Sequence, residues 1–266
     1  MTSIRFVAIG DSFTEGVGDE PAPGIVRGWA DLVAQGWADA VAGSVEGGTV
    51  EYANLAIRGK LAQPIIDEQL EPALALKPTH LSFNGGGNDM LRPRTTLSHI
   101  VDLFSHVLRR CDEEGVRLIL LSGGNPSGQL PMGRMVQRRG DRLSQLVAER
   151  LADRPDVVVA LNWPDRELAT PAYWAPDRLH LNSRGHHRVA ARVLTSLGLE
   201  PRPEWWSFTE LPEAQRLGRA AYLREHLGPW VRRRLTGTSS GDGRDPKYPE
   251  FTPVYPTSTT GEPPLR

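Results

Sequence analysis

Short apolar runs rich in β-branched residues alternate with longer segments of helical periodicity along the first 200 residues of the chain. A strand that reads as a continuous apolar run is covered on both faces, and strands separated by helical segments pair in parallel. The candidate strands are residues 4–9, 50–54, 80–84, 118–122 and 157–161. This alternation predicts an α/β fold, a three-layer α/β/α sandwich around a central five-stranded parallel sheet.

The chain divides into three regions by its pattern. Residues 1–200 carry the alternation and are predicted to form one domain. Residues 201–235 follow with a segment of helical periodicity and are predicted to be a C-terminal helical extension. Residues 236–266 are dominated by Gly, Pro, Ser and Thr, which bury too little apolar surface to offset their ordering entropy. We therefore expect a disordered tail whose removal leaves stability and activity nearly unchanged.

Composition narrows the class of partner. A formal net charge of −1 over 266 residues favours neither nucleic acid nor an anionic membrane. No window approaches ~18 consecutive apolar residues, so no membrane span is predicted, and the first residues lack the pattern of a signal peptide, so we expect a cytoplasmic protein. Cys111 is the one cysteine, which excludes an intrachain disulfide and a cysteine-rich zinc site. It lies on the apolar face of a predicted helix and is interpreted as a core residue.

A nucleophile with its base is suggested by two distant segments. Asp177 stands three residues before His180, so its carboxylate can reach Nδ1 of that ring across one turn and leave Nε2 free to deprotonate a hydroxyl. Ser12 offers the hydroxyl, because it directly follows the first predicted strand, at the edge of the sheet where ligands bind in open α/β folds. An attacking serine also needs donors for the oxyanion that forms.

Candidate donors follow the second and third predicted strands. Gly59 lies after the second strand, and residues 85–87 with Asn88 lie after the third. All of them would open onto the same edge as Ser12, because parallel strands end on one side of the sheet. Glycine lets a backbone N–H approach a substrate closely, and the Asn88 amide donates without adding charge.

These segments together resemble the SGNH (GDSL-like) hydrolase family over about residues 4–197. The four matching blocks are Gly10-Asp11-Ser12, Gly59, Gly86-Gly87-Asn88-Asp89, and the run from Asp177 through His180 and Asn182 to Gly185-His186. The resemblance implies a flavodoxin-like hydrolase domain over residues 1–200, and an esterase that needs no cofactor and no metal. Its substrate would be a small-molecule, lipid or carbohydrate ester. The sequence departs from the family's pattern at Arg178, where relatives commonly carry glycine.

The same resemblance assigns a role to each site residue. Ser12 would be the nucleophile that carries a covalent acyl group, His180 the general base and then acid, and Asp177 the residue that orients the histidine. Ser12 N–H, Gly59 N–H and the Asn88 side chain would form the oxyanion hole.

Several alternatives stay open from the residues alone. Ser12 and Gly59 can each be simple turn residues, and Asp11 and Asp89 are interpreted as caps that pin their loops. Trp163 and Trp174 can line a substrate pocket or pack in the core. An acyltransferase would use the same serine, whereas a metallophosphoesterase would need more histidine ligands than these segments supply. A binding module on a hydrolase scaffold is a further possibility, although every catalytic residue type is present.

Overall fold

The computed structural model describes residues 2–44, 47–92, 95–130, 132–207 and 238–257, together with positions 224, 228 and 236. Its described part is built on a six-stranded sheet with the order β5-β4-β3-β1-β2-β6. The first five strands pair in parallel, which confirms the predicted sheet. They are β1 (Thr2–Ile9), β2 (Gly48–Asn54), β3 (His80–Phe83), β4 (Arg117–Leu121) and β5 (Val158–Ala160).

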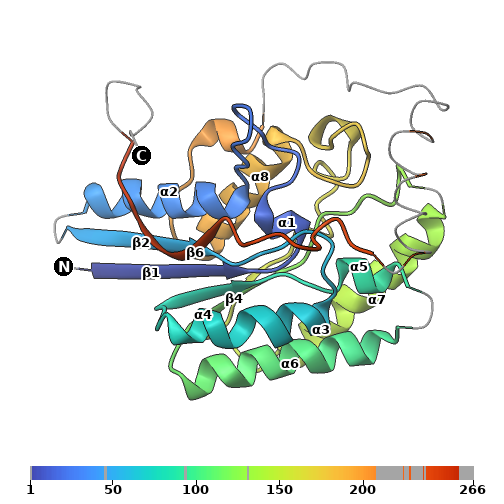
Figure 1. Ribbon diagram of the computed structural model, residues 1–266, viewed down its shortest axis with the longest axis horizontal. Helices are drawn as coiled ribbons and strands as arrows, with labels where there is room; N and C mark the ends of the chain where they lie inside the picture. Colours follow the sequence, from blue (N-terminus) through green and yellow to red (C-terminus); the bar gives the residue numbers. More distant parts are fainter. Residues whose placement is uncertain are drawn as a thin grey trace.

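Helices cover both faces of the sheet, as the three-layer prediction requires (Figure 1). One face is covered by α2 (Trp29–Ala42) and α8 (Ser183–Ser196). The other face is covered by α3 (Ala62–Ile65), the π-helical turn η1 (Ile66–Leu70), α4 (Glu71–Ala75), α6 (Leu97–Glu113) and α7 (Gly133–Arg150). Two short helices, α1 (Ser12–Glu15) and α5 (Gly87–Met90), lie at the carboxyl end of the strands.

Strand β1 divides the core into two layers. Its side chains alternate, so that Phe6 packs under α2 while Val7 joins the cluster beneath α3, α4 and α6. The Phe6 and Trp37 rings meet edge to face with centroids 5.2 Å apart, and burying each such ring stabilises the fold by about 1.5–3 kcal/mol. Cys111 is fully buried in the second layer, which confirms its prediction as a core residue. Within the described residues no helix combines the length and apolar character needed to cross a bilayer.

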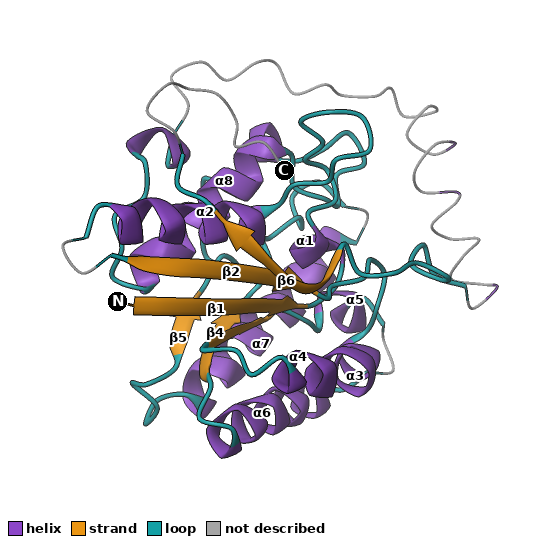
Figure 2. Cartoon of the chain, turned by 60° about the vertical axis from the view of Figure 1, so that its left-hand side comes forward, coloured by secondary structure: helices purple, strands orange, loops and turns teal. Residues whose placement is uncertain are grey.

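The sixth strand corrects the prediction of a five-stranded sheet. Strand β6 (Tyr248–Val254) pairs antiparallel with the edge strand β2 (Figure 2). The expectation of a disordered tail over residues 236–266 is therefore wrong for residues 238–257. Composition misses this strand because its ladder is made by backbone groups, and because an edge strand accommodates prolines such as Pro249 and Pro253 that would break a central one.

Side chains also anchor this segment. The Tyr248 ring meets the Tyr52 ring at 5.8 Å, and Lys247 Nζ lies 2.6 Å from the carboxylate of Asp31, with less than a fifth of either side chain exposed. Of the predicted helical extension over residues 201–235, the structure describes a short 3₁₀ turn, η3 (Pro203–Trp205). Almost all of the segment from 208 to 235 lies outside the described residues, so that helix stays a prediction, as does a domain boundary at 200.

Deleting residues 238–266 should destabilise the protein. The deletion uncovers the β2 edge and leaves Asp31 without its cation, at a cost of about 1–3 kcal/mol for the carboxylate alone. A loss of about 2 kcal/mol should lower Tm by about 4–8 °C in a domain of this size. Thermal unfolding followed by circular dichroism measures the change, and an unaltered Tm would show that the segment does not contribute to stability.

Candidate active site

The segment that carries Ser12 is held tightly at the end of β1. Gly10 has no room for a side chain, because a Cβ there would lie 2.5 Å from Thr14 Oγ1 and 2.8 Å from the Asn84 carbonyl. The buried Gln69 side chain binds both polar groups of Gly10, accepting from its N–H at 2.8 Å and donating to its carbonyl at 3.0 Å. Ser12 then begins α1. Sequence reasoning missed Gln69, since it lies on a helix remote from every motif.

Asp11 caps α1, as predicted, and it also binds the predicted oxyanion donor. Its Oδ1 accepts from Phe13 N–H at 3.0 Å, and its Oδ2 accepts from Asn88 Nδ2 at 3.0 Å. The same Asn88 amide donates to the Lys60 carbonyl at 3.0 Å, so both of its hydrogens have acceptors. Asp11 is 5 % exposed, and this burial raises its pKa to about 6 against the opposing hydrogen bond from Phe13.

Asp177 and His180 form the pair that the sequence predicts. Asp177 Oδ2 lies 2.5 Å from His180 Nδ1, and Oδ1 accepts from the N–H groups of Leu179 and His180 at 3.0 Å each. Burial works to raise the pKa of Asp177, but the hydrogen bonds and charge of His180 outweigh it and lower the pKa to about 2. The carboxylate is thus ionised over the physiological range and fixes the proton of the ring on Nδ1.

Arg178, the position at which the sequence departs from the resemblance, has an unusual backbone conformation. Its φ is 62°, in the left-handed region that favours glycine. This conformation lets the tight turn from Asp177 to His180 close. The Arg178 backbone therefore adopts a conformation that glycine reaches at lower cost than arginine.

Gly59 lies in a turn after β2, with a φ of 79°. The preceding residue, Arg58, holds this turn against α1. Its backbone N–H donates to Glu15 Oε2 at 2.7 Å, and its guanidinium binds Glu15 Oε1 at 2.5 Å. Glu15 is a second residue that sequence reasoning missed, because nothing in the motif Gly10-Asp11-Ser12 indicates a partner 43 positions away.

The structure brings the four predicted segments to one edge of the sheet. Asp11 adjoins Ser12 in the chain and binds Asn88, and the charge of His180 acts on the pKa of Asp11. The loop after α1 lies against the histidine segment, since a Cβ at Gly18 would be 2.0 Å from the Leu181 carbonyl and 3.4 Å from His180 Cβ. In the described part of the chain no hydrogen bond joins the Ser12 hydroxyl to His180, and such bonds are often long in unliganded enzymes.

Residues around the site have structural roles. His186 is fully buried, accepts from Trp29 N–H at Nδ1 and donates to the Val17 carbonyl from Nε2, at 3.2 and 3.3 Å. Burial lowers its pKa to about 4, so it is neutral. Asp89 accepts from Ala62 N–H at 2.9 Å and pins its loop as predicted. Trp163 and Trp174 are buried in two core clusters, which favours packing over a pocket wall. No group of histidine, cysteine and acidic side chains among the described residues is arranged to hold a metal ion.

Comparisons with known proteins relate the sequence to one family and the fold to several solved structures. The sequence matches the model of the GDSL-like lipase/acylhydrolase family over residues 8–188. A lipase from a goat rumen metagenome has a similar structure, with 19 % identity, 73 % of this chain and 97 % of that chain covered, and a TM-score of 0.58. A catalytic mutant of the acetylxylan esterase Axe2 from Geobacillus stearothermophilus has 23 % identity and a TM-score of 0.58, with 77 % of this chain and 96 % of that chain covered. TesA has 20 % identity and a TM-score of 0.57, with 74 % of this chain and 98 % of that chain covered. No curated protein matches the sequence.

Replacing Asp11 by asparagine should change how stability depends on pH. The folded-state pKa of about 6 lies above the ordinary value of 3.8, so the folded protein binds more protons and the wild type loses stability as pH rises through this range. The Asp11→Asn variant lacks this loss. Its free energy of unfolding, relative to wild type, should therefore rise by about 2 kcal/mol between pH 4 and pH 7. Urea unfolding at each pH measures the difference, and a difference that stays constant contradicts the buried carboxylate.

Proposed function

The chain belongs to the GDSL-like lipase/acylhydrolase family, a family of ester hydrolases, and we propose that it cleaves carboxylic esters through a covalent acyl group on Ser12. The observation that carries this proposal is the 2.5 Å contact between His180 Nδ1 and Asp177, on a loop that adjoins the segment after α1. A histidine held at Nδ1 by a carboxylate presents an unprotonated Nε2, which is the form a general base needs.

The first chemical step is acylation of Ser12. His180 Nε2 takes the hydroxyl proton while Ser12 Oγ attacks the ester carbonyl, and Asp177 stabilises the imidazolium that forms. The proton then passes from Nε2 to the departing alcohol, so the carbon–oxygen bond breaks without releasing an alkoxide. The acyl group remains on Ser12 as an ester.

The oxyanion hole consists of Ser12 N–H, Gly59 N–H and the Asn88 amide. At rest the Asn88 hydrogens bind Asp11 and the Lys60 carbonyl, so in this proposal the developing oxyanion takes over the hydrogen that the Lys60 carbonyl accepts. The exchange favours the transition state, because a full negative charge is a stronger acceptor than a carbonyl.

Water completes the reaction by hydrolysing the acyl-serine with His180 as the base. An alcohol in place of water would make the protein an acyltransferase, and product analysis with an added alcohol separates the two. The similar structures include an acetylxylan esterase and a lipase. We therefore propose a small-molecule, lipid or carbohydrate ester as substrate, and a p-nitrophenyl ester series from acetate to palmitate as the probe of acyl length.

Ser12→Ala and His180→Ala should each lower kcat on the preferred p-nitrophenyl ester by ~10⁴ to 10⁶, and the double variant should be little worse than either. The two losses do not add because the side chains act as one unit. Steady-state kinetics with and without a chelator provide the measurement. Additive losses would show that the two side chains act independently. Turnover abolished by the chelator would show that the reaction depends on a metal and would favour the metallophosphoesterase alternative.

Asn88→Ala should lower kcat by ~10² to 10³ while KM changes much less, because the amide stabilises charge that exists only in the transition state. The same ester series measures both constants. A defect confined to KM would place Asn88 in substrate binding and remove it from the oxyanion hole.

A further inference from the structure

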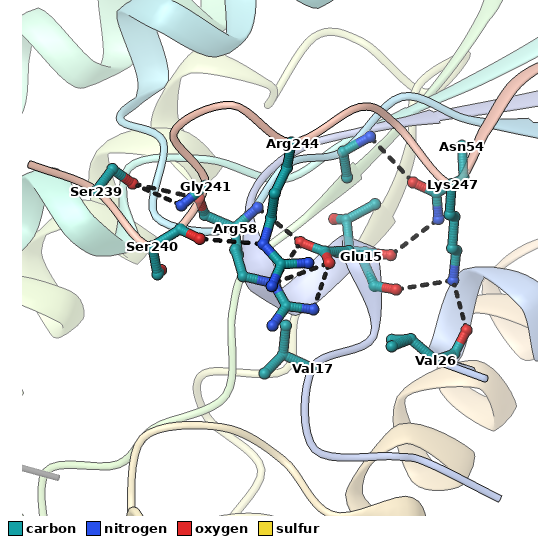
Figure 3. A network of polar contacts seen from close by, with 12 residues as sticks. Glu15, Val17, Val26, Asn54, Arg58, Ser239, Ser240, Gly241, Arg244 and Lys247 are labelled. Atoms are coloured by element: carbon teal, nitrogen blue, oxygen red, sulfur yellow. Dashed lines mark hydrogen bonds and ion pairs between the residues drawn. The ribbon is translucent and has the colours of Figure 1, made fainter. Parts of the chain in front are cut away.

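A C-terminal strap, residues 238–257, lies outside the residues that match the family model and yet contacts the proposed oxyanion hole. Strand β6 forms its second half, and the turn at 239–242 precedes it. Figure 3 shows how the first half of the strap lies against Arg58 and Glu15. The strap therefore contacts both the edge of the sheet and the loop that carries Gly59.

The turn of the strap packs directly on the Gly59 loop. A Cβ at Gly241 would lie 2.2 Å from the Arg58 carbonyl and 2.7 Å from Ile57 Cγ2, and a Cβ at Gly59 would lie 2.3 Å from Ser239 Oγ. Ser239 Oγ also accepts a hydrogen bond from Gly241 N–H at 3.2 Å and donates one to the Arg58 carbonyl at 3.4 Å. The backbones of Gly241 and Arg58 thus meet with no side chain between them, so a displacement of one moves the other.

Lys247 makes a second contact, with the helix that carries Ser12. Its Nζ donates to the Glu15 carbonyl at 2.7 Å and to the Val26 carbonyl at 3.3 Å, and it pairs with Asp31 at 2.6 Å. The side chain is 16 % exposed. Glu15 is therefore bound from two sides, at its carbonyl by Lys247 and at its carboxylate by Arg58 (Figure 3).

We propose that Ser239, Gly241 and Lys247 are positioning residues for ester hydrolysis, which hold the Arg58–Gly59 peptide against α1 and so fix the Gly59 N–H relative to Ser12. The inference rests on the proposed function, in which Gly59 N–H is an oxyanion donor. Such a donor must lie about 2.7–3.1 Å from the oxyanion, and a misplacement of about 1 Å can cost ~10² in rate. The Gly59 turn is half-buried, and the strap supplies contacts to it through Ser239 and Gly241.

A matched pair of glycine variants tests this proposal. Gly241→Ala adds a Cβ against the Arg58 carbonyl, whereas Gly243→Ala adds one in the same turn where no atom lies within 4 Å. Gly243 has a φ of 72°, so its variant strains the turn without touching the Gly59 loop. We expect Gly241→Ala to lower kcat by ~10-fold or more with KM within ~3-fold of wild type, and Gly243→Ala to keep the wild-type kcat.

The outcomes distinguish this inference from the proposed function. Equal kcat values for the two glycine variants, both folded by circular dichroism, overturn the positioning role while Ser12→Ala remains inactive. If Gly241→Ala does not fold, Ser239→Ala decides, because it removes a hydroxyl without adding bulk: a lower kcat at unchanged KM supports the role, and a wild-type kcat overturns it. Turnover by Ser12→Ala removes the premise and overturns both proposals.

Discussion

The parallel pairing of β1 with both β2 and β3 is the constraint on which the site depends. Parallel strands end at the same edge of a sheet, so the residues that follow these three strands must lie near one another: Ser12 after β1, Gly59 after β2 and Asn88 after β3. The hydrophobic layers that enforce the pairing contain no catalytic group. Burial of Phe6 and Val7 in different clusters fixes which face of β1 meets each helical layer, and the Gln69 amide binds both polar groups of Gly10 at the end of the strand.

Asp11 shows that the site is assembled at a cost in stability. Burial of the Asp11 carboxyl group, which is 5 % exposed, disfavours its ionisation. In that position the group nevertheless caps α1 and accepts a hydrogen bond from Asn88. Asp177 has the opposite balance, because hydrogen bonds and the charge of His180 outweigh its burial. The two acids therefore differ in pKa by several units at one site, and each difference follows from the partners that the fold supplies.

The C-terminal strap addresses a general problem of open sheets. An uncovered edge strand presents unpaired backbone groups, and β6 covers the edge at β2. The same segment carries Lys247 into a site bounded by α1, α2 and the loop at Val26. A single stretch of chain thus pairs with the β2 edge and contacts the loop with Gly59, which is why we assign it a role in positioning as well as in stability.

The sequence by itself determined the five parallel strands, the pairing of Asp177 with His180 and the capping role of Asp11, because these depend on periodicity or on neighbours within a few residues. It did not indicate Gln69, Glu15 or Lys247, whose partners lie 59, 43 and up to 232 positions away. It also predicted disorder where β6 forms, because composition measures the apolar surface a segment can bury and not the backbone hydrogen bonds offered by a distant edge. Only the tertiary structure decided these contacts, since each depends on two segments that meet after the sheet has formed.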